Sequence, residues 1–385
     1  MSDTAPKTPR SENPGWMHRV ASLEGVAAIL LLAVGAWQGI EAIASAPAQQ
    51  RLRPTLTGEA FLAGRTTAAV NYVMAHQLPS DPLLRATGGV FRYMLFGSGG
   101  PQVRVGCDDT LFLTEELRPW PEAQAAMAER AAGLRRVQAA LAARGIPVVI
   151  AIVPDKARVM ENRLCGAPWS AQSRARHDAW LAAMRSAGVT DVVPLLPALT
   201  AQAARPGGAY YRTDTHWNQD GARAAAQAIA AAIANRELAR NEAYRTDLAP
   251  EEANGPGDLL RLMSLDRVGN ALRPDPDRER KARTEAPEGE GGGGSLLDEV
   301  PTAEVALIGS SYSVNANFHG FLQEALRGSI YNAAEAGGGF AGAAATYLAG
   351  ENFRETPPKL IIWEIPERVI AQPLTAAERA FIARW

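Results

Sequence analysis

The stretch Val305-Ala-Leu-Ile-Gly-Ser-Ser-Tyr-Ser313 is the most informative part of this sequence about the fold. The mostly apolar run 303–308, in which Glu304 is the one charged residue, ends at Gly309, which is typical of a short buried strand followed by a turn. Beyond the small polar residues, three apolar side chains recur at helical spacing: Phe318, Leu322 and Leu326. The stretch therefore predicts a strand, a tight turn and a helix.

Ser311 lies at this predicted turn and has two interpretations. The free N–H groups at the start of a helix favour negative charge, so a serine hydroxyl there suits chemistry that passes through an oxyanion. The alternative is structural, with Ser310 or Ser313 only capping the helix. The stretch alone leaves both interpretations open.

A second stretch, Tyr211-Arg-Thr-Asp-Thr-His-Trp-Asn218, supplies partners for a serine nucleophile. Asp214 and His216 are two residues apart, so both can line one extended or looped segment. A carboxylate on one ring nitrogen fixes the tautomer and leaves the other nitrogen as a base. Asn218 can cap the helix that follows. A metal site would want further ligands close by in the sequence, and we expect no metal here.

His216 is the best candidate base among the five histidines. It combines an acid partner with a loop setting, and the others do not: His18, His76, His177 and His319. His319 lies about two helical turns, ~12 Å, beyond the serine turn.

The rest of the chain alternates between strand and helix patterns. Strands are predicted at 147–153, 189–196, 303–308, 328–332 and 359–365, separated by helices that include Ser170–Ala187 and an Ala-rich helix after Pro121. This alternation predicts an α/β fold with a mostly parallel, doubly wound sheet. Ligands in such sheets bind at the carboxyl ends of the strands, where Ser311 falls.

Three motifs together resemble the alginate O-acetyltransferase proteins, which are SGNH-hydrolase-like enzymes of exopolysaccharide acetylation. The motifs are Thr213–Asn218, Gly309–Ser313 and Trp363–Arg368. Residues 103–113 resemble the family's entry strand, and Ile152–Lys156 its next core strand. The resemblance implies Ser311 as nucleophile, His216 as base and Asp214 as the residue that orients the base. Because the serine motif follows the Asp-His motif, the order looks circularly permuted.

The resemblance also suggests an oxyanion hole made by a glycine N–H and an asparagine. Gly338 and Asn332 are the candidates, with an ordinary tight turn as the alternative. The two cysteines, Cys107 and Cys165, form a disulfide in one interpretation and stay unpaired thiols in the other.

The N-terminal region predicts a membrane anchor. Residues 20–40 carry one charge, and twenty-one helical residues span ~31 Å. The weakly basic flank of residues 1–19 predicts a cytoplasmic tail, which puts the rest of a single-pass inner-membrane protein in the periplasm. The alternative is a signal peptide cleaved near Ala46 or Ala48.

Residues 50–385 are expected to form one SGNH-like acetyltransferase domain, interrupted by a flexible Pro-, charge- and Gly-rich loop at 271–295. The net charge of −2 and pI of about 6.3 argue against nucleic acid as a main partner. We expect no cofactor.

The resemblance implies an O-acetyltransferase that acts on an exported polysaccharide and receives acetyl groups through a membrane-bound O-acyltransferase. Two other hypotheses stay open: a carbohydrate acetylesterase with the same triad, and a non-catalytic polysaccharide-binding subunit.

Overall fold

The computed structural model describes residues 15–240, 242–286 and 303–385, so most of the predicted cytoplasmic tail lies outside the described residues. The chain divides into a unit that ends at Gly88 and a unit from Gly89 to Trp385. The domain bounds expected from the sequence, residues 50–385, stay a prediction.

The first unit is helical. Its helices are α1 (Gly15–Ala44), α2 (Ala46–Leu52), α3 (Gly58–Leu62) and α4 (Arg65–His76), and α5 (Asp81–Phe96) crosses the boundary. Ala42, Val73 and Leu52 form part of a small buried cluster between α1, α2 and α4. The hydroxyl of Ser45 donates to Gln77 Oε1 at 2.9 Å and ties α2 to the end of α4.

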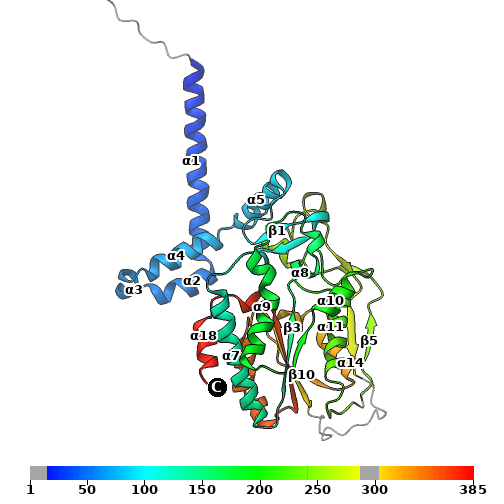
Figure 1. Cartoon of the computed structure of the whole chain (residues 1–385). Helices are drawn as coiled ribbons and strands as arrows, with labels where there is room; N and C mark the ends of the chain where they lie inside the picture. The colour runs from blue at the N-terminus through cyan, green and yellow to red at the C-terminus, as the bar shows by residue number, and fades with distance from the viewer. Residues whose placement is uncertain (1–14, 241, 287–302) are drawn as a thin grey trace, which may run out of the picture. The chain divides into compact units, whose positions relative to one another are not determined.

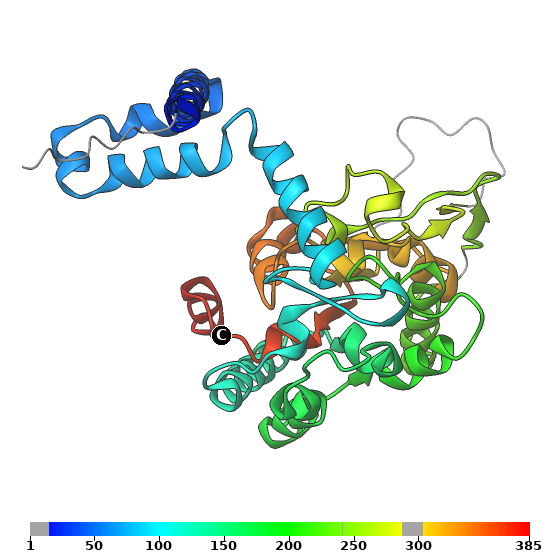
Figure 2. The same ribbon diagram turned by 90° about the horizontal axis from the view of Figure 1, so that it is seen from above.

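Helix α1 is one continuous helix of 30 residues, which Figure 2 shows along its axis. Within the described ranges, Ser22–Ala44 is the one segment long and apolar enough to cross a bilayer, with a mean hydropathy of 1.9. Its large apolar side chains, such as Leu31 and Leu32, are exposed. This helix covers the span predicted at residues 20–40, and it is a candidate anchor or signal sequence.

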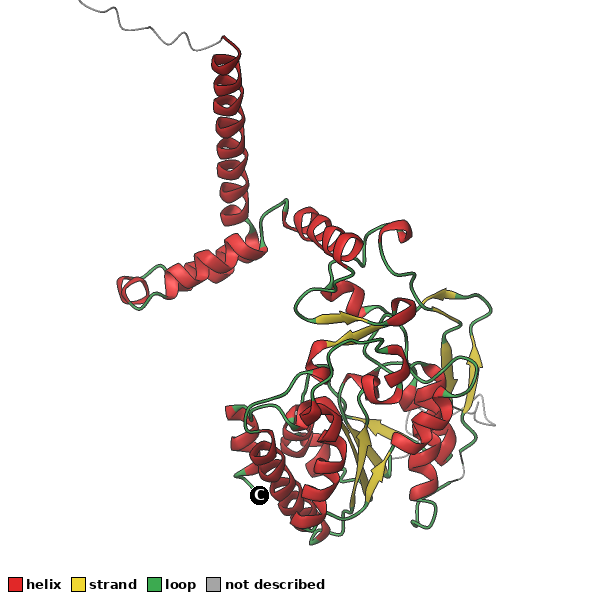
Figure 3. Ribbon diagram, turned by 45° about the horizontal axis from the view of Figure 1, so that its top comes forward, coloured by secondary structure: helices red, strands yellow, loops and turns green. Residues whose placement is uncertain are grey.

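The second unit is built on a five-stranded parallel sheet with the order β10-β9-β11-β3-β4. These strands are β3 (Val148–Val153), β4 (Val192–Pro194), β9 (Val305–Ile308), β10 (Ile330–Asn332) and β11 (Leu360–Pro366). β11 and β3 pair from Ile361 opposite Val148 to Pro366 opposite Val153. Figure 3 shows the strands in yellow among the helices.

Helices cover both faces of the sheet, as a doubly wound fold requires (Figure 1). One face carries α7 (Ala123–Ala142), α9 (Ala171–Ala187), α15 (Gly342–Ala349), α16 (Glu351–Glu355), α17 (Glu367–Ile370) and α18 (Ala376–Ile382); the other carries α10 (Leu196–Ala203), α11 (Gln219–Ala232) and α14 (Phe318–Leu326). Alternate residues of β3 belong to the two cores, with Ile150 in one and Val149 in the other. This explains the continuous apolar run, and the α/β expectation is confirmed.

The second unit also contains short elements. They are α6 (Thr114–Leu117), α8 (Lys156–Val159), α12 (Asp258–Leu262), α13 (Ser311–Val314), β1 (Val103–Val105), β2 (Leu111–Leu113), β5 (Arg245–Leu248), β6 (Ala253–Asn254), β7 (Arg278–Glu279), β8 (Ala282–Glu285) and the 3₁₀ turns Cys107–Asp109, Glu161–Arg163 and Asn270–Leu272. The first unit has one such turn, Arg53–Thr55. Cys107 and Cys165 form a disulfide bond with Cα atoms 5.5 Å apart.

Three local expectations differ from the structure. Residues 103–113 form the antiparallel pair β1–β2, apart from the main sheet. The strand expected at 189–196 is only Val192–Pro194, because Leu196 already starts α10. Part of the loop expected to be flexible at 271–295 is ordered, since β7 and β8 pair with β6 and β5. The part of that loop from residue 287 onward lies outside the described residues.

A buried ion pair joins α7 to α18. Arg130 Nη2 lies 2.9 Å from Glu378 Oε1, and its Nη1 donates to the carbonyl oxygens of Ile370 and Gln372 at 2.9 and 2.6 Å. Glu378 also completes a capping box with Thr375 at the start of α18.

We predict that Arg130→Met lowers the free energy of unfolding by about 3–5 kcal/mol, because it leaves the Glu378 carboxylate buried without its partner. Urea denaturation followed by circular dichroism measures the change. The matched control is Arg379→Met, whose side chain is 59% exposed and whose Nε lies 3.6 Å from Glu129 Oε1, with an expected change of at most about 1 kcal/mol. Equal losses in both variants would contradict the prediction.

Candidate active site

Ser311 is the first residue of α13, immediately beyond the carboxyl end of β9. The residue before it, Ser310, is the N-cap, and its hydroxyl accepts from the N–H of Tyr312 at 3.2 Å. The cap and the candidate nucleophile are therefore different serines, so the two interpretations of this turn are compatible. Ser311 is partly exposed, whereas Ser310 and Ser313 are buried.

The buried carboxylate of Glu364, on β11, holds this turn in place. It accepts from the N–H and the hydroxyl of Ser310 at 2.7 and 2.9 Å, and from the hydroxyl of Ser313 at 3.0 Å. Burial raises the pKa of Glu364, while these donors act in the opposite direction. A Cβ at Gly309 would lie 2.8 Å from the same carboxylate, so only glycine fits there.

His216 connects the two motifs that the sequence singled out. Its Nε2 lies 2.7 Å from Ser311 Oγ, and its Nδ1 lies 2.6 Å from Asp214 Oδ1. Because an ionised carboxylate can only accept, Nδ1 carries the proton toward Asp214 and Nε2 is free to accept from the serine hydroxyl. These contacts are those expected of an acyl-transfer triad, and the catalytic roles of the three residues stay a prediction.

Asp214 is buried, and burial alone would raise its pKa. The hydrogen bond and charge of His216, together with backbone donors, outweigh burial and lower the pKa of Asp214 to about 2. The stability gained from this ionised carboxylate is present above the ordinary pKa of 3.8 and is lost as the pH falls through about 2. Asp214 therefore stays ionised at neutral pH, as an orienting residue should.

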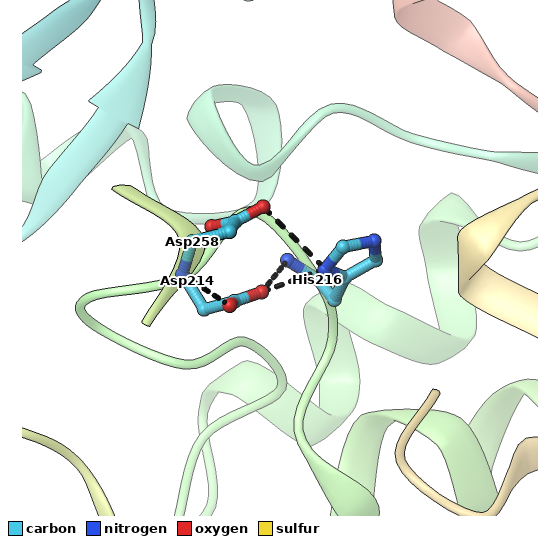
Figure 4. Close-up of side chains that lie close together, drawn as sticks. All are labelled: Asp214, His216 and Asp258. Atoms are coloured by element: carbon cyan, nitrogen blue, oxygen red, sulfur yellow. Dashed lines mark hydrogen bonds and ion pairs between the residues drawn. The ribbon is translucent and has the colours of Figure 1, made fainter. Parts of the chain in front are cut away.

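Asp258, the first residue of α12, is a second acid beside the triad that sequence reasoning missed. Its N–H donates to Asp214 Oδ2 at 2.8 Å, and its Oδ1 accepts from the N–H of Thr215 at 2.8 Å. Its Oδ2 accepts from the Thr215 hydroxyl and lies 3.7 Å from His216 Nδ1. Burial and the charge of Asp214 raise the pKa of Asp258. Figure 4 shows both carboxylates on the same side of the His216 ring.

Asp214, His216 and Asp258 each offer one ligand atom within 4.8 Å of the others, which is the spacing of a metal site. However, His216 Nδ1 and the Asp214 carboxylate already form a hydrogen bond, and Asp258 holds Thr215. A cation would have to displace these bonds. The expectation that the site works without a metal stays a prediction.

A buried phenol forms the wall behind His216. The Tyr312 ring lies 4.9 Å from the His216 ring, and its hydroxyl donates to the Thr215 carbonyl at 2.9 Å. Arg368 Nη1 donates to the same hydroxyl at 3.1 Å, so Arg368 holds this loop through Tyr312. Burial raises the pKa of Tyr312 well above its ordinary value, so the phenol keeps its proton.

Lys156 holds the loop that carries Asp214 through hydrogen bonds to backbone carbonyls. Its buried ammonium donates to the carbonyl oxygens of Leu111, Arg212 and Asp214 at 2.6, 2.9 and 2.9 Å. Burial lowers the pKa of Lys156 to about 8, although several nearby carboxylates act in the opposite direction. Lys156 lies three residues beyond the end of β3, at the carboxyl edge of the sheet where Ser311 also lies.

Of the two oxyanion candidates, Asn332 is the last residue of β10 and Gly338 lies in the loop that follows this strand. The Gly338 N–H donates to the Glu335 carbonyl at 3.1 Å, and its own carbonyl accepts from Gly342. The exposed Asn332 side chain accepts from the N–H of Ala334 at 3.1 Å. These contacts do not connect either residue to Ser311, and their role in an oxyanion hole stays a prediction.

Residues 103–367 match the family model described as the SGNH hydrolase-like domain of the acetyltransferase AlgX. The chain is 33% identical over 362 residues to the probable alginate O-acetylase AlgJ of Pseudomonas putida, covering 92% of this chain and 90% of that protein. The probable alginate O-acetylase AlgJ of Pseudomonas aeruginosa is 34% identical over 345 residues, which cover 84% of this chain and 86% of that protein.

A solved structure supports the same relationship. The O-acetyltransferase domain of Pseudomonas putida AlgJ superposes with a TM-score of 0.64 at 33% identity, covering 74% of this chain and 98% of that domain. The chain therefore belongs to the AlgX and AlgJ family of SGNH hydrolase-like acetyltransferases.

Proposed function

We propose that this protein transfers acetyl groups to hydroxyls of an exported polysaccharide through an acetyl-enzyme on Ser311. The observation that carries the proposal is the chain of contacts Ser311–His216–Asp214, at 2.7 and 2.6 Å, in a member of an acetyltransferase family. Alginate is the first candidate polysaccharide, because relatives that align with most of the chain are probable alginate O-acetylases.

The reaction runs in two steps. The Oγ of Ser311 attacks the carbonyl carbon of an acetyl ester, its proton passes to His216 Nε2, and the donor alcohol leaves with that proton. In the second step His216 takes the proton of a sugar hydroxyl, whose oxygen attacks the seryl ester. The bond from carbon to Oγ breaks, and Oγ recovers the proton from His216. Asp214 stabilises the imidazolium that forms in both steps.

The location we propose is the periplasmic face of the inner membrane, with α1 as an anchor. The Cys107–Cys165 disulfide supports an oxidising compartment. A membrane-bound O-acyltransferase would supply acetyl groups, and the anchor would keep the enzyme close to it. Both parts rest on the family resemblance and on the apolar span Ser22–Ala44.

We predict that Ser311→Ala lowers acetyl transfer to an oligosaccharide by at least about 10³-fold, because the nucleophile is lost. Full-length protein would be assayed with p-nitrophenyl acetate as donor and oligomannuronate as acceptor, with mass spectrometry of the sugar. The control Ser186→Ala, on the exposed face of α9, should match the wild type.

The same assay separates the alternatives. Acetate release that depends on Ser311 but is unaffected by the sugar would indicate an esterase. No Ser311-dependent turnover, while the sugar still binds, would indicate a binding subunit.

The two acids near His216 should differ in their effect. Asp214→Asn is expected to lower the turnover number by about 10⁴-fold, because an amide cannot hold the required tautomer. Asp258→Asn should lower the turnover number by at most about tenfold, because the new amide can still form hydrogen bonds to Thr215. Steady-state kinetics of both variants test this. A larger loss at Asp258 would assign the orienting role to that residue instead.

If α1 is an uncleaved anchor, the full-length chain should stay in the membrane pellet after alkaline carbonate extraction. Intact-mass measurement gives the N-terminus of the same material. A chain that begins after Ala46 or Ala48 and appears in the soluble fraction would instead identify a cleaved signal peptide.

A further inference from the structure

A pocket of about 330 Å³, within the size range of small-ligand sites, lies among the segments 211–219, 254–256, 279–282 and 315–317. Its lining includes Tyr211, Gln219, Asn254, Glu279, Lys281 and Asn315, and we refer to these residues as the acceptor pocket. The mechanism described above uses none of them.

The walls of the acceptor pocket belong to the same segments that hold the triad. The N–H of Asn315 donates to the Ser311 carbonyl at 3.0 Å, and the N–H of Tyr211 donates to the His216 carbonyl at 3.2 Å. Asn254 lies four residues before Asp258 in the chain. Backbone hydrogen bonds therefore tie two walls of the pocket to the segments that carry Ser311 and His216.

A fixed hydrogen-bond acceptor lies in this pocket. Glu279 Oε2 accepts from the Tyr211 hydroxyl and, at 2.7 Å, from Gln219 Nε2. The N–H of Ala282 donates to the Gln219 side-chain oxygen, which sets the orientation of that amide. Within the described residues, the hydrogen bonds from Tyr211 and Gln219 both go to Oε2 of Glu279. The other carboxylate oxygen, Oε1, is therefore available to accept from a sugar hydroxyl.

The segment along the pocket is cationic. Residues 278–283 contain four basic side chains and one acid, a net charge of +3. Arg278 donates to Asn254, and Arg280 donates to the Ala249 carbonyl at 2.6 Å. Lys281 is exposed and lines the pocket, and no acidic partner is found for its ammonium among residues 15–240, 242–286 and 303–385.

We propose that the acceptor pocket binds one uronic acid residue of the polysaccharide, with Lys281 on the carboxylate and Glu279 on a ring hydroxyl. An ammonium beside a carboxylate forms a charge-assisted hydrogen bond, and the polar walls suit a sugar. This assignment rests on the proposed function and adds the residue that selects an anionic acceptor.

The test is direct binding, without an acetyl donor, so that it does not depend on turnover. Isothermal titration calorimetry of the full-length protein in detergent would compare a mannuronate hexamer with a neutral mannose hexamer. We expect the mannuronate hexamer to bind more tightly, and Lys281→Gln to weaken its binding about two- to tenfold, as removal of a partly exposed charge pair allows.

Two further variants make the result specific. Lys281→Arg keeps the charge and should retain most of the affinity. Lys359→Gln removes an exposed lysine just before the amino end of β11, at the opposite edge of the sheet, and should bind as the wild type does. The difference between wild type and Lys281→Gln should shrink in high salt, because salt screens exposed charges.

Equal binding of the two hexamers, or wild-type affinity in Lys281→Gln, would overturn the proposal. Absence of measurable binding by the wild type would also overturn it. Loss of Ser311-dependent transfer together with intact, Lys281-dependent binding would contradict the proposed function and leave the uronate site in place.

Discussion

Three hydrogen bonds from the buried ammonium group of Lys156 hold the loop that carries Asp214. The ammonium group gathers the carbonyls of Leu111, Arg212 and Asp214, which come from two separate segments, at the carboxyl end of β3. A charged group inside a protein is costly unless its donors are satisfied, and here three carbonyl acceptors satisfy all three N–H bonds. The loop is therefore held by its backbone, which leaves the Asp214 carboxylate free to face His216.

A buried acidic side chain, Glu364, holds the turn around Ser311 in a comparable way. Glu364, on the neighbouring strand β11, collects the donors of Ser310 and Ser313 around the buried turn. Ser311 projects from this turn with its hydroxyl directed at His216 Nε2. Glu364 lies on β11 and Lys156 lies just beyond the end of β3, so two adjacent parallel strands carry the groups that hold the segments of Ser311 and Asp214.

Much of this arrangement could be predicted from the sequence, because strong local signals were present. Continuous apolar runs predicted β3, β9 and β11, and the cap residue Asn218 predicted the start of α11. Ser311 and His216 could be singled out because each combines a reactive group with a turn or loop setting. The structure brings Ser311, His216 and Asp214 together.

The missed features depend on contacts between segments that are distant in sequence. Asp258 follows a Gly-Pro-Gly turn 42 residues after His216, and nothing in its neighbourhood distinguishes it from a solvated acid. The segment 271–286 reads as a flexible linker because charged and proline residues dominate it, yet β7 and β8 are ordered by pairing with β6 and β5. In both cases the charge is stabilised by partners that only the folded chain supplies. Composition alone cannot distinguish an ordered, ligand-binding segment from a flexible linker. A charged loop segment near a predicted nucleophile is therefore better treated as a candidate part of the binding site.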